Sequence, residues 1–342
     1  MYLGSTGMVC SVGLSATAAC AAMRAGIAKF DELRFRDVDG LPIIGAMIES
    51  LTVELQSGSR LVEMLAMAIQ DCVAQKPAMG MERVPLLVGL AEPARPGGAA
   101  GSGESLISQV QGRLGLKFHS GLSKVIPKGH TAGFDALRLA RELLQRPEVS
   151  GCLVCGVDSY LNSHSLRWLD HQWRLKREGH TDGVIPGEAA AAALVQREAP
   201  EKAENRVEVV GLGFGHEKAT VVSEEPLLAL GLADAARQAL AEAGWGFHEL
   251  DFRLSDVTGE NYGFRELALI EGRLARVARS QNQPVWHAAD AIGDTGAAAG
   301  VVQLARAAAA WAKGCAPGTR AACFTSAVPG DRAVALLRCD GA

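Results

Sequence analysis

The chain has 342 residues, 48% of them hydrophobic and 21% charged, and its formal net charge is −4. This composition supports a large buried core and excludes an intrinsically disordered chain. The sequence has no basic stripe and no apolar stretch of about 20 residues, so we expect neither a nucleic-acid partner nor a membrane span.

Strands and helices alternate through the first half of the chain. Apolar periodicity predicts strands at 2–12, 84–90, 151–158 and 189–196 and helices at 15–24, 60–75, 104–114 and 133–144. Residues 91–103, rich in Pro, Gly and Ala, are predicted as a loop. The polar, basic segment 163–186 is predicted as an excursion over the surface.

Residues 197–206 are charged and unpatterned, and they mark a join between two halves, 1–200 and 205–342. Beyond the join we predict strands at 207–213, 252–255, 321–325 and 333–338, and helices at 225–243 and 265–277. Residues 285–288, a β-type or loop stretch, lead to a Gly-Asp-Thr turn at 293–295. The alternation of strands and helices indicates an α/β layered fold.

One tripeptide pattern occurs twice, as Gly129-His130-Thr131 and Gly293-Asp294-Thr295. Each copy opens an Ala-rich helix that has one apolar stripe. Two similar halves, each presenting a polar residue at a helix N-terminus, indicate a duplicated α/β fold with one central site.

Several motifs occur in an order and spacing that resemble the thiolase superfamily, and within it the β-ketoacyl-ACP synthases. They are Thr6–Ser15, His130–Gly133, Val154–Asp158, Asp182–Glu188, Asp256–Glu260 and Gly293–Gly300. The resemblance implies a five-layer α-β-α-β-α fold built from two halves, and a dimer that pairs strands near the nucleophile.

In that family a Cys at a helix N-terminus attacks the acyl thioester, and two His, or His and Asn, polarise the thioester carbonyl. The positions that match this triad here hold His130, Asp256 and Asp294. Neighbouring pocket positions are Thr131, Gly133, Thr258, Glu260 and Thr295.

These replacements oppose the family's condensation chemistry. An acyl-imidazole hydrolyses readily, so His130 is a poor substitute for a thiolate. An ionised Asp256 or Asp294 repels a developing oxyanion, and loss of one oxyanion donor costs on the order of 10²–10³ in rate. We therefore expect a degenerate condensing enzyme that acts as a binding, adaptor or partner subunit.

Alternatives remain open. Because degenerate thiolase-like proteins are encoded near type VI secretion effectors, an adaptor for such an effector is one form of this role. The alternative is an acyl-thioester hydrolase or acyltransferase in which Asp294 orients His130 as a general base. A third is a condensing enzyme with rearranged residues.

The resemblance implies a homodimer, or a heterodimer with a related subunit, and an acyl carrier protein or effector is a further possible partner. We expect no cofactor and no metal. Residues 1–28 lack the basic start of a signal peptide, and we expect a cytoplasmic protein.

Three further patterns have simpler explanations. Cys152 and Cys155 lie in a buried strand, where residues three apart face opposite sides, and the eight scattered cysteines are predicted to be free thiols. Gly211–Gly215 resembles a dinucleotide loop but has His216 at the sixth position, and it fits the start of the second half equally well. The histidines at 164, 171 and 180 have no standard metal spacing, which favours a solvated segment.

Overall fold

The computed structural model describes residues 1–51, 57–75, 80–98, 103–199, 205–279 and 283–341. These residues form one 10-stranded mixed sheet in the order β10-β9-β11-β12-β8-β1-β7-β6-β4-β5, and a separate hairpin of β2 and β3. The strands are β1 Tyr2–Cys10, β2 Asp31–Arg36, β3 Pro42–Gly45, β4 Leu86–Leu90, β5 Lys124–Pro127, β6 Cys152–Ser159, β7 Glu188–Gln196, β8 Arg206–His216, β9 Phe252–Ser255, β10 Val285–His287, β11 Arg320–Ser326 and β12 Asp331–Asp340.

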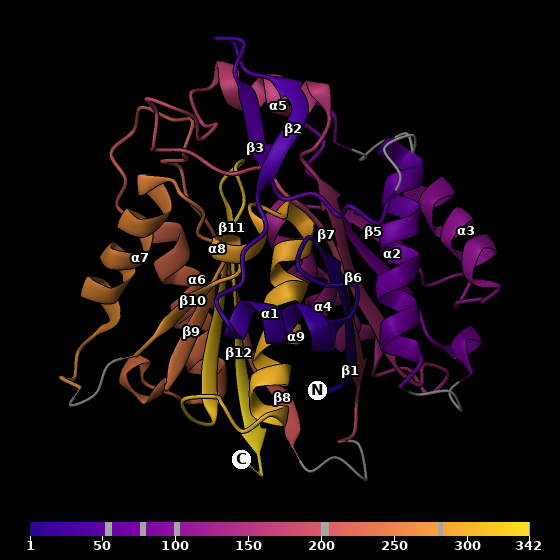
Figure 1. The fold of residues 1–342 in the computed structure, drawn as a ribbon. Coiled ribbons are helices and arrows are strands. Elements are labelled where there is room, and N and C mark those ends of the chain that lie inside the picture. Colours follow the sequence, from indigo (N-terminus) through magenta and orange to yellow (C-terminus); the bar gives the residue numbers. More distant parts are fainter. Residues whose placement is uncertain (52–56, 76–79, 99–102, 200–204, 280–282, 342) are drawn as a thin grey trace.

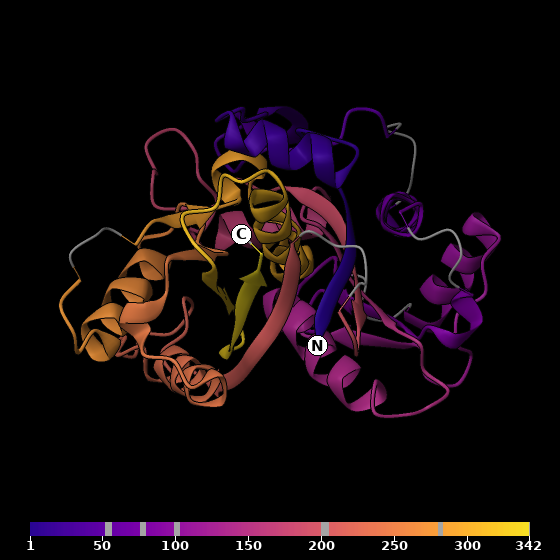
Figure 2. The ribbon, with the colours of Figure 1, turned by 90° about the horizontal axis from the view of Figure 1, so that it is seen from below.

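The large sheet consists of two half-sheets that meet along a short seam. Strands β1 and β8 pair only at Tyr2–Glu208 and Leu3–Val207. The first half-sheet therefore holds strands from before residue 200 and the second holds strands from after it. Seen from below, the halves diverge from the seam (Figure 2).

Helices fill the space between the half-sheets and cover their outer faces. Helices α4 and α9 contact strands of both halves, α2 packs on the first half-sheet and α6 on the second. The result is the predicted order of five layers, visible in Figures 1 and 2. The helices are α1 Ala16–Arg24, α2 Ser57–Val73, α3 Gly103–Leu114, α4 Ala132–Leu143, α5 Ser163–His171, α6 Leu230–Ala243, α7 Asn261–Leu274, α8 Ala289–Ile292 and α9 Ala299–Ala312.

Glycines in β8 let α6 lie unusually close to the strand. A Cβ added at Gly211, Gly213 or Gly215 would stand 2.3, 1.8 or 2.1 Å from a backbone oxygen of α6. This close approach explains the alternating glycines, because any side chain there would push the helix away. The spacing at 211–215 thus serves helix packing within a strand, and there is no loop at this place to hold a dinucleotide.

Most predicted elements are present, and α1 begins as predicted, with Ser15 accepting a hydrogen bond from the Ala18 N–H. Helix α6 begins five residues later than predicted because Ala229 adopts a left-handed φ of 52°. The excursion predicted at 163–186 is wrong in part: it contains α5, and Leu175 and Val184 are fully buried. Strands β2, β3 and β5 were not predicted. Residues 99–102 of the predicted loop and 200–204 of the predicted join lie outside the described residues.

The eight cysteines are free, as predicted, and only Cys315 is exposed. Cys152 and Cys155 belong to core clusters on opposite faces of β6, which agrees with the buried-strand interpretation. Within the described ranges, no helix is long and apolar enough to cross a membrane.

Candidate functional site

The two repeated turns meet in the central layer. Gly129–Thr131 forms a 3-10 turn directly before α4, and a second 3-10 turn, Gly296–Ala298, precedes α9. Gly129 and Gly293 have φ of 58° and 67°, a left-handed conformation that glycine adopts without a Cβ penalty. A Cβ on Gly133 would stand 2.9 Å from Val301, so the first turns of α4 and α9 are in close contact.

Two of the motifs on which the resemblance rests hold Asp294 in place. The Asp294 N–H donates to the Ile185 carbonyl at 2.8 Å, and the Gly187 N–H donates to the Asp294 carbonyl at 3.0 Å. Asp158 accepts a hydrogen bond from the Ala297 N–H at 2.9 Å and forms a buried ion pair with Arg95. The segments around 158 and 186 therefore position the second turn.

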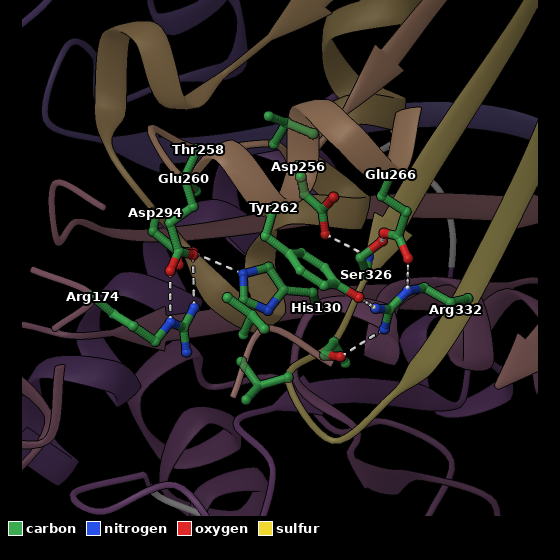
Figure 3. Close-up of a pocket in the computed structure, with 15 residues that line it drawn as sticks. His130, Arg174, Asp256, Thr258, Glu260, Tyr262, Glu266, Asp294, Ser326 and Arg332 are labelled. Atoms are coloured by element: carbon green, nitrogen blue, oxygen red, sulfur yellow. Dashed lines mark hydrogen bonds and ion pairs between the residues drawn. The ribbon is translucent and has the colours of Figure 1, made fainter. Parts of the chain in front are cut away.

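His130 and Asp294 form a direct contact. The distance from His130 Nε2 to Asp294 Oδ1 is 2.8 Å, and both side chains are buried (Figure 3). The same carboxylate oxygen accepts a hydrogen bond from the Gly296 N–H at 2.9 Å. Because an ionised carboxylate can only accept a hydrogen bond, His130 Nε2 carries a proton and donates this hydrogen bond to Asp294 Oδ1.

The contact also determines the charge of the imidazole. Burial lowers the pKa of His130, but the negative charge of Asp294 and its hydrogen bond outweigh burial and raise that pKa to about 9. Burial raises the pKa of Asp294, and the His130 charge reverses this and leaves the pKa below its usual value. At neutral pH the pair is an imidazolium–carboxylate ion pair.

Asp256 lines the same pocket but forms no hydrogen bond with His130. Its Oδ2 accepts a hydrogen bond from the Ser326 N–H at 2.7 Å. Burial raises the pKa of Asp256 to about 6, against the opposing charge of His130. The three triad positions inferred from the sequence therefore converge on one pocket, but only His130 and Asp294 are hydrogen-bonded to each other.

Two arginine–glutamate pairs complete the walls (Figure 3). Arg174 donates to both carboxylate oxygens of Glu260 at 2.7 and 2.8 Å. Arg332 donates through Nε to Glu266 at 2.7 Å and through a terminal nitrogen to the Tyr262 hydroxyl at 2.7 Å. The pocket between them has a volume of only about 60 Å³.

The other predicted pocket residues divide into two groups. Thr258 and Glu260 line the pocket. Thr131, Gly133 and Thr295 lie in or beside the two turns and are buried, but none of them lines it.

Sequence reasoning missed five polar residues of the pocket. Arg174 lies in the segment wrongly predicted as a surface excursion, and the only signal for Arg332 is a charge directly before the apolar run 333–337. The five residues are Arg174, Tyr262, Glu266, Ser326 and Arg332. Among the described residues, no group of three His, Cys, Asp or Glu side chains has the geometry to hold a metal ion.

Solved structures with a similar arrangement of elements include ketosynthases. The ketosynthase from module 6 of the bacillaene synthase of Bacillus subtilis 168 aligns with a TM-score of 0.76 at 15% identity, over 98% of this chain and 71% of that one. A structure of a ketosynthase in complex with its chain length factor from Xenorhabdus doucetiae aligns with a TM-score of 0.71 at 14% identity. The alignment covers 99% of this chain and 98% of the matched one. The ishigamide ketosynthase/chain length factor gives 0.71 at 20% identity, over 98% of each chain. No protein-family model and no curated protein matches the chain.

The fold is therefore thiolase-like, as predicted from the motifs. Within that class, the chain has the architecture of ketosynthases and chain length factors. At identities of 20% or less this similarity concerns the fold, and the residues of the pocket determine the chemistry.

Proposed function

We propose that this chain is a non-catalytic binding or partner subunit built on a ketosynthase scaffold. The observation that carries the proposal is the ion pair between His130 and Asp294. A nucleophile needs a lone pair, and an imidazolium has none on either nitrogen. At neutral pH the side chain expected to replace the family's cysteine is therefore unable to attack a thioester.

The size of the pocket supports the same proposal. A volume of about 60 Å³ accommodates a few water molecules. Sites for small organic ligands are typically roughly 300–1,000 Å³. An acyl thioester therefore does not fit beside His130 unless the pocket widens.

A thioester hydrolase is the second candidate function, and two observations favour it. His130 has the carboxylate contact of a general base, and one terminal guanidinium nitrogen of Arg174, Nη1, is buried without a hydrogen-bond partner beside the pocket. In this reaction His130 would take a proton from water as the water oxygen bonds to the carbonyl carbon. The proton would then pass to the departing thiolate, while Arg174 donates to the oxyanion.

The two candidates differ in their dependence on pH. The hydrolase needs neutral His130, and since the pKa of this side chain is about 9, its rate must rise between pH 7 and pH 9. A partner subunit shows no enzymatic turnover at any pH.

Incubation with acyl-CoA and acyl-ACP at pH 7 and pH 9 tests both. Mass spectrometry would measure the intact protein for covalent adducts and the solution for free acid. We expect neither adduct nor free acid above the buffer background. Free acid that increases with pH and disappears in His130→Ala would establish the hydrolase, whereas full turnover in His130→Ala would exclude a His130 base.

The partner we propose is a second ketosynthase-like subunit, either another copy of this chain or a related one. Structures with the same fold include ketosynthases bound to chain length factors and a ketosynthase bound to an acyl carrier protein. In the described part of the chain β5 is one of the two end strands of the large sheet, and it ends three residues before His130. An end strand presents backbone groups for pairing.

Co-purification from the native host, with identification by mass spectrometry, tests this partner. Recovery of a ketosynthase-like chain, or a dimer of this chain alone, supports the proposed subunit. Recovery of a type VI secretion effector would favour the adaptor form of the proposal. A chain that elutes as a monomer at every concentration, with no specific partner, would contradict it.

A further inference from the structure

A second pocket, separate from that of His130, lies between α1, β10 and the C-terminal part of α9. Its volume is about 270 Å³, and it shares no lining residue with the first pocket. Arg306 of α9 lines this pocket. Its position on the helix is roughly 10 Å beyond Ala299, the first residue of α9, at 1.5 Å per residue. Helices α1 and α9 lie against each other in Figure 1 and are in contact.

Among the described residues, none supplies a counter-anion within ion-pair distance of the Arg306 guanidinium. Its Nη1 nitrogen is buried and has no hydrogen-bond partner, and no carboxylate of the described residues lies within ion-pair distance of it. The charge of Asp290 raises the pKa of Arg306 from a distance, without forming an ion pair with it. The guanidinium carbon instead lies 5.4 Å from the ring centroid of Trp286. Burial lowers the pKa of Arg306, as expected for a cation that is desolvated without full compensation.

The rest of the lining shows which ligand would compensate this charge. Arg24 supplies a second cation, and no carboxylate in the described part of the chain lines the pocket. Met23, Trp286 and two alanines of α9 supply apolar walls. A buried cation is costly unless paired, so an anionic head group would be favoured at Arg306 and an apolar body against the walls.

We propose that this pocket binds a small amphipathic anion, with its carboxylate or phosphate at Arg306 and a short apolar chain against Met23 and Trp286. Carboxylate and phosphate both accept two parallel hydrogen bonds from a guanidinium. A volume slightly below the roughly 300 Å³ of typical ligand sites limits the body to a short chain. This site stands independently of the role proposed for the His130 pocket.

Cys315 offers a readout that is specific to this pocket. It lines the pocket and is the one exposed cysteine of the eight, so mild alkylation with iodoacetamide should modify it first. Octanoate and octyl phosphate are the probes, and 1-octanol is the neutral control. We expect at least one acid at saturation to slow Cys315 alkylation at least about fivefold, and calorimetry to give a Kd below about 1 mM.

Variants separate the charge from the shape of the pocket. Arg306→Gln should weaken binding of the protecting acid at least about tenfold without lowering Tm, because it removes an unpaired buried charge. The matched control is Arg237→Gln on α6, an exposed arginine paired with Asp234, which should leave binding unchanged.

Comparison of the Kd values of octanoate and octyl phosphate identifies the preferred head group, because the acid with the lower Kd carries the group that the pocket favours. The proposal is wrong if neither acid protects Cys315 at about 5 mM, a concentration above the expected Kd. It is equally wrong if 1-octanol protects as well as the acids, or if Arg306→Gln binds the acids as tightly as the unmodified chain.

Discussion

At the scale of single residues, the properties of the candidate site follow from one hydrogen bond. His130 and Asp294 are 164 residues apart in the chain, yet their side-chain atoms are 2.8 Å apart. Each keeps the other charged in a buried place where either alone would tend to be neutral. The pair therefore contributes to stability, and this contribution depends on pH.

We predict that stability falls as pH rises from about 6.5 to about 9. The pKa of His130 is raised in the folded chain, so the contribution is complete below the unfolded pKa of about 6.5 and is lost as pH passes the folded value of about 9. This shift in the pKa of His130 corresponds to a loss on the order of 3 kcal/mol in the free energy of unfolding. Urea unfolding at pH 6, 7.5 and 9.5 would measure it.

His130→Gln is the control for this experiment, because it removes the titrating group. The pH dependence of its unfolding free energy should be flatter than that of the unmodified chain over the same range. Parallel curves for the two proteins would contradict the assigned pKa of His130.

A second residue-scale prediction concerns His130→Cys, which restores the family's nucleophile. The neighbouring Asp294 carboxylate should keep the thiol protonated, and the pocket of about 60 Å³ should exclude the substrate. We expect no acyl adduct on the introduced thiol after incubation with acyl-CoA, as measured by intact mass.

The double variant His130→Cys, Asp294→Asn separates the two causes. Acylation of the double variant alone would identify the carboxylate as the obstacle, and no acylation of either variant would identify the small volume of the pocket as the obstacle. Rapid acylation of the single variant would contradict both arguments.

How much of the site was predictable also differs from residue to residue. The repeated Gly-x-Thr turn was sufficient to select His130 and Asp294, because both follow a glycine at the start of an Ala-rich helix. Arg174 and Arg332 had no comparable signal. Their importance comes from pairing with Glu260 and Glu266, which lie 86 and 66 residues away in the chain.

At the scale of elements, glycine determines how closely helices approach strands. We predict that Gly213→Ala destabilises the chain by about 1–3 kcal/mol, since the new Cβ would meet the Ala235 carbonyl oxygen of α6 at 1.8 Å. Gly112→Ala in α3 is the matched control, because no atom of the described residues beyond the neighbouring backbone of its own helix lies within 4 Å of its added Cβ. It should stabilise the helix by about 0.5–1 kcal/mol.

Chemical unfolding of both variants would measure the difference. If Gly213→Ala is as stable as the unmodified chain, then α6 can move away from β8 at little cost. In that case the alternating glycines at 211–215 would need another explanation.

At the scale of the whole molecule, the sheet has two ends that differ in their expected role. Strand β5 precedes the candidate site, and β10 lies at the opposite end. If subunits pair through β5, its backbone amides should exchange with deuterium more slowly at high protein concentration, and those of β10 should not change.

Hydrogen–deuterium exchange at two protein concentrations, together with light scattering, would test this pairing. The amides of β10 provide the internal control in the same sample. Protection of β5 that does not depend on concentration, in a chain that scatters as a dimer, would place the interface elsewhere.

The sequence by itself determined the alternating α/β elements, the duplicated turn and the motifs that indicate a thiolase-like fold. These are local patterns, because periodicity and glycine spacing are visible within about ten to twenty neighbouring residues. Tertiary structure alone decided the charge of His130, the small volume of the pocket that Arg174 and Arg332 line, and the unpaired Arg306 beside Trp286. Those properties depend on distances between side chains far apart in the chain and on removal of water around them, and neither quantity is encoded in any short stretch of sequence.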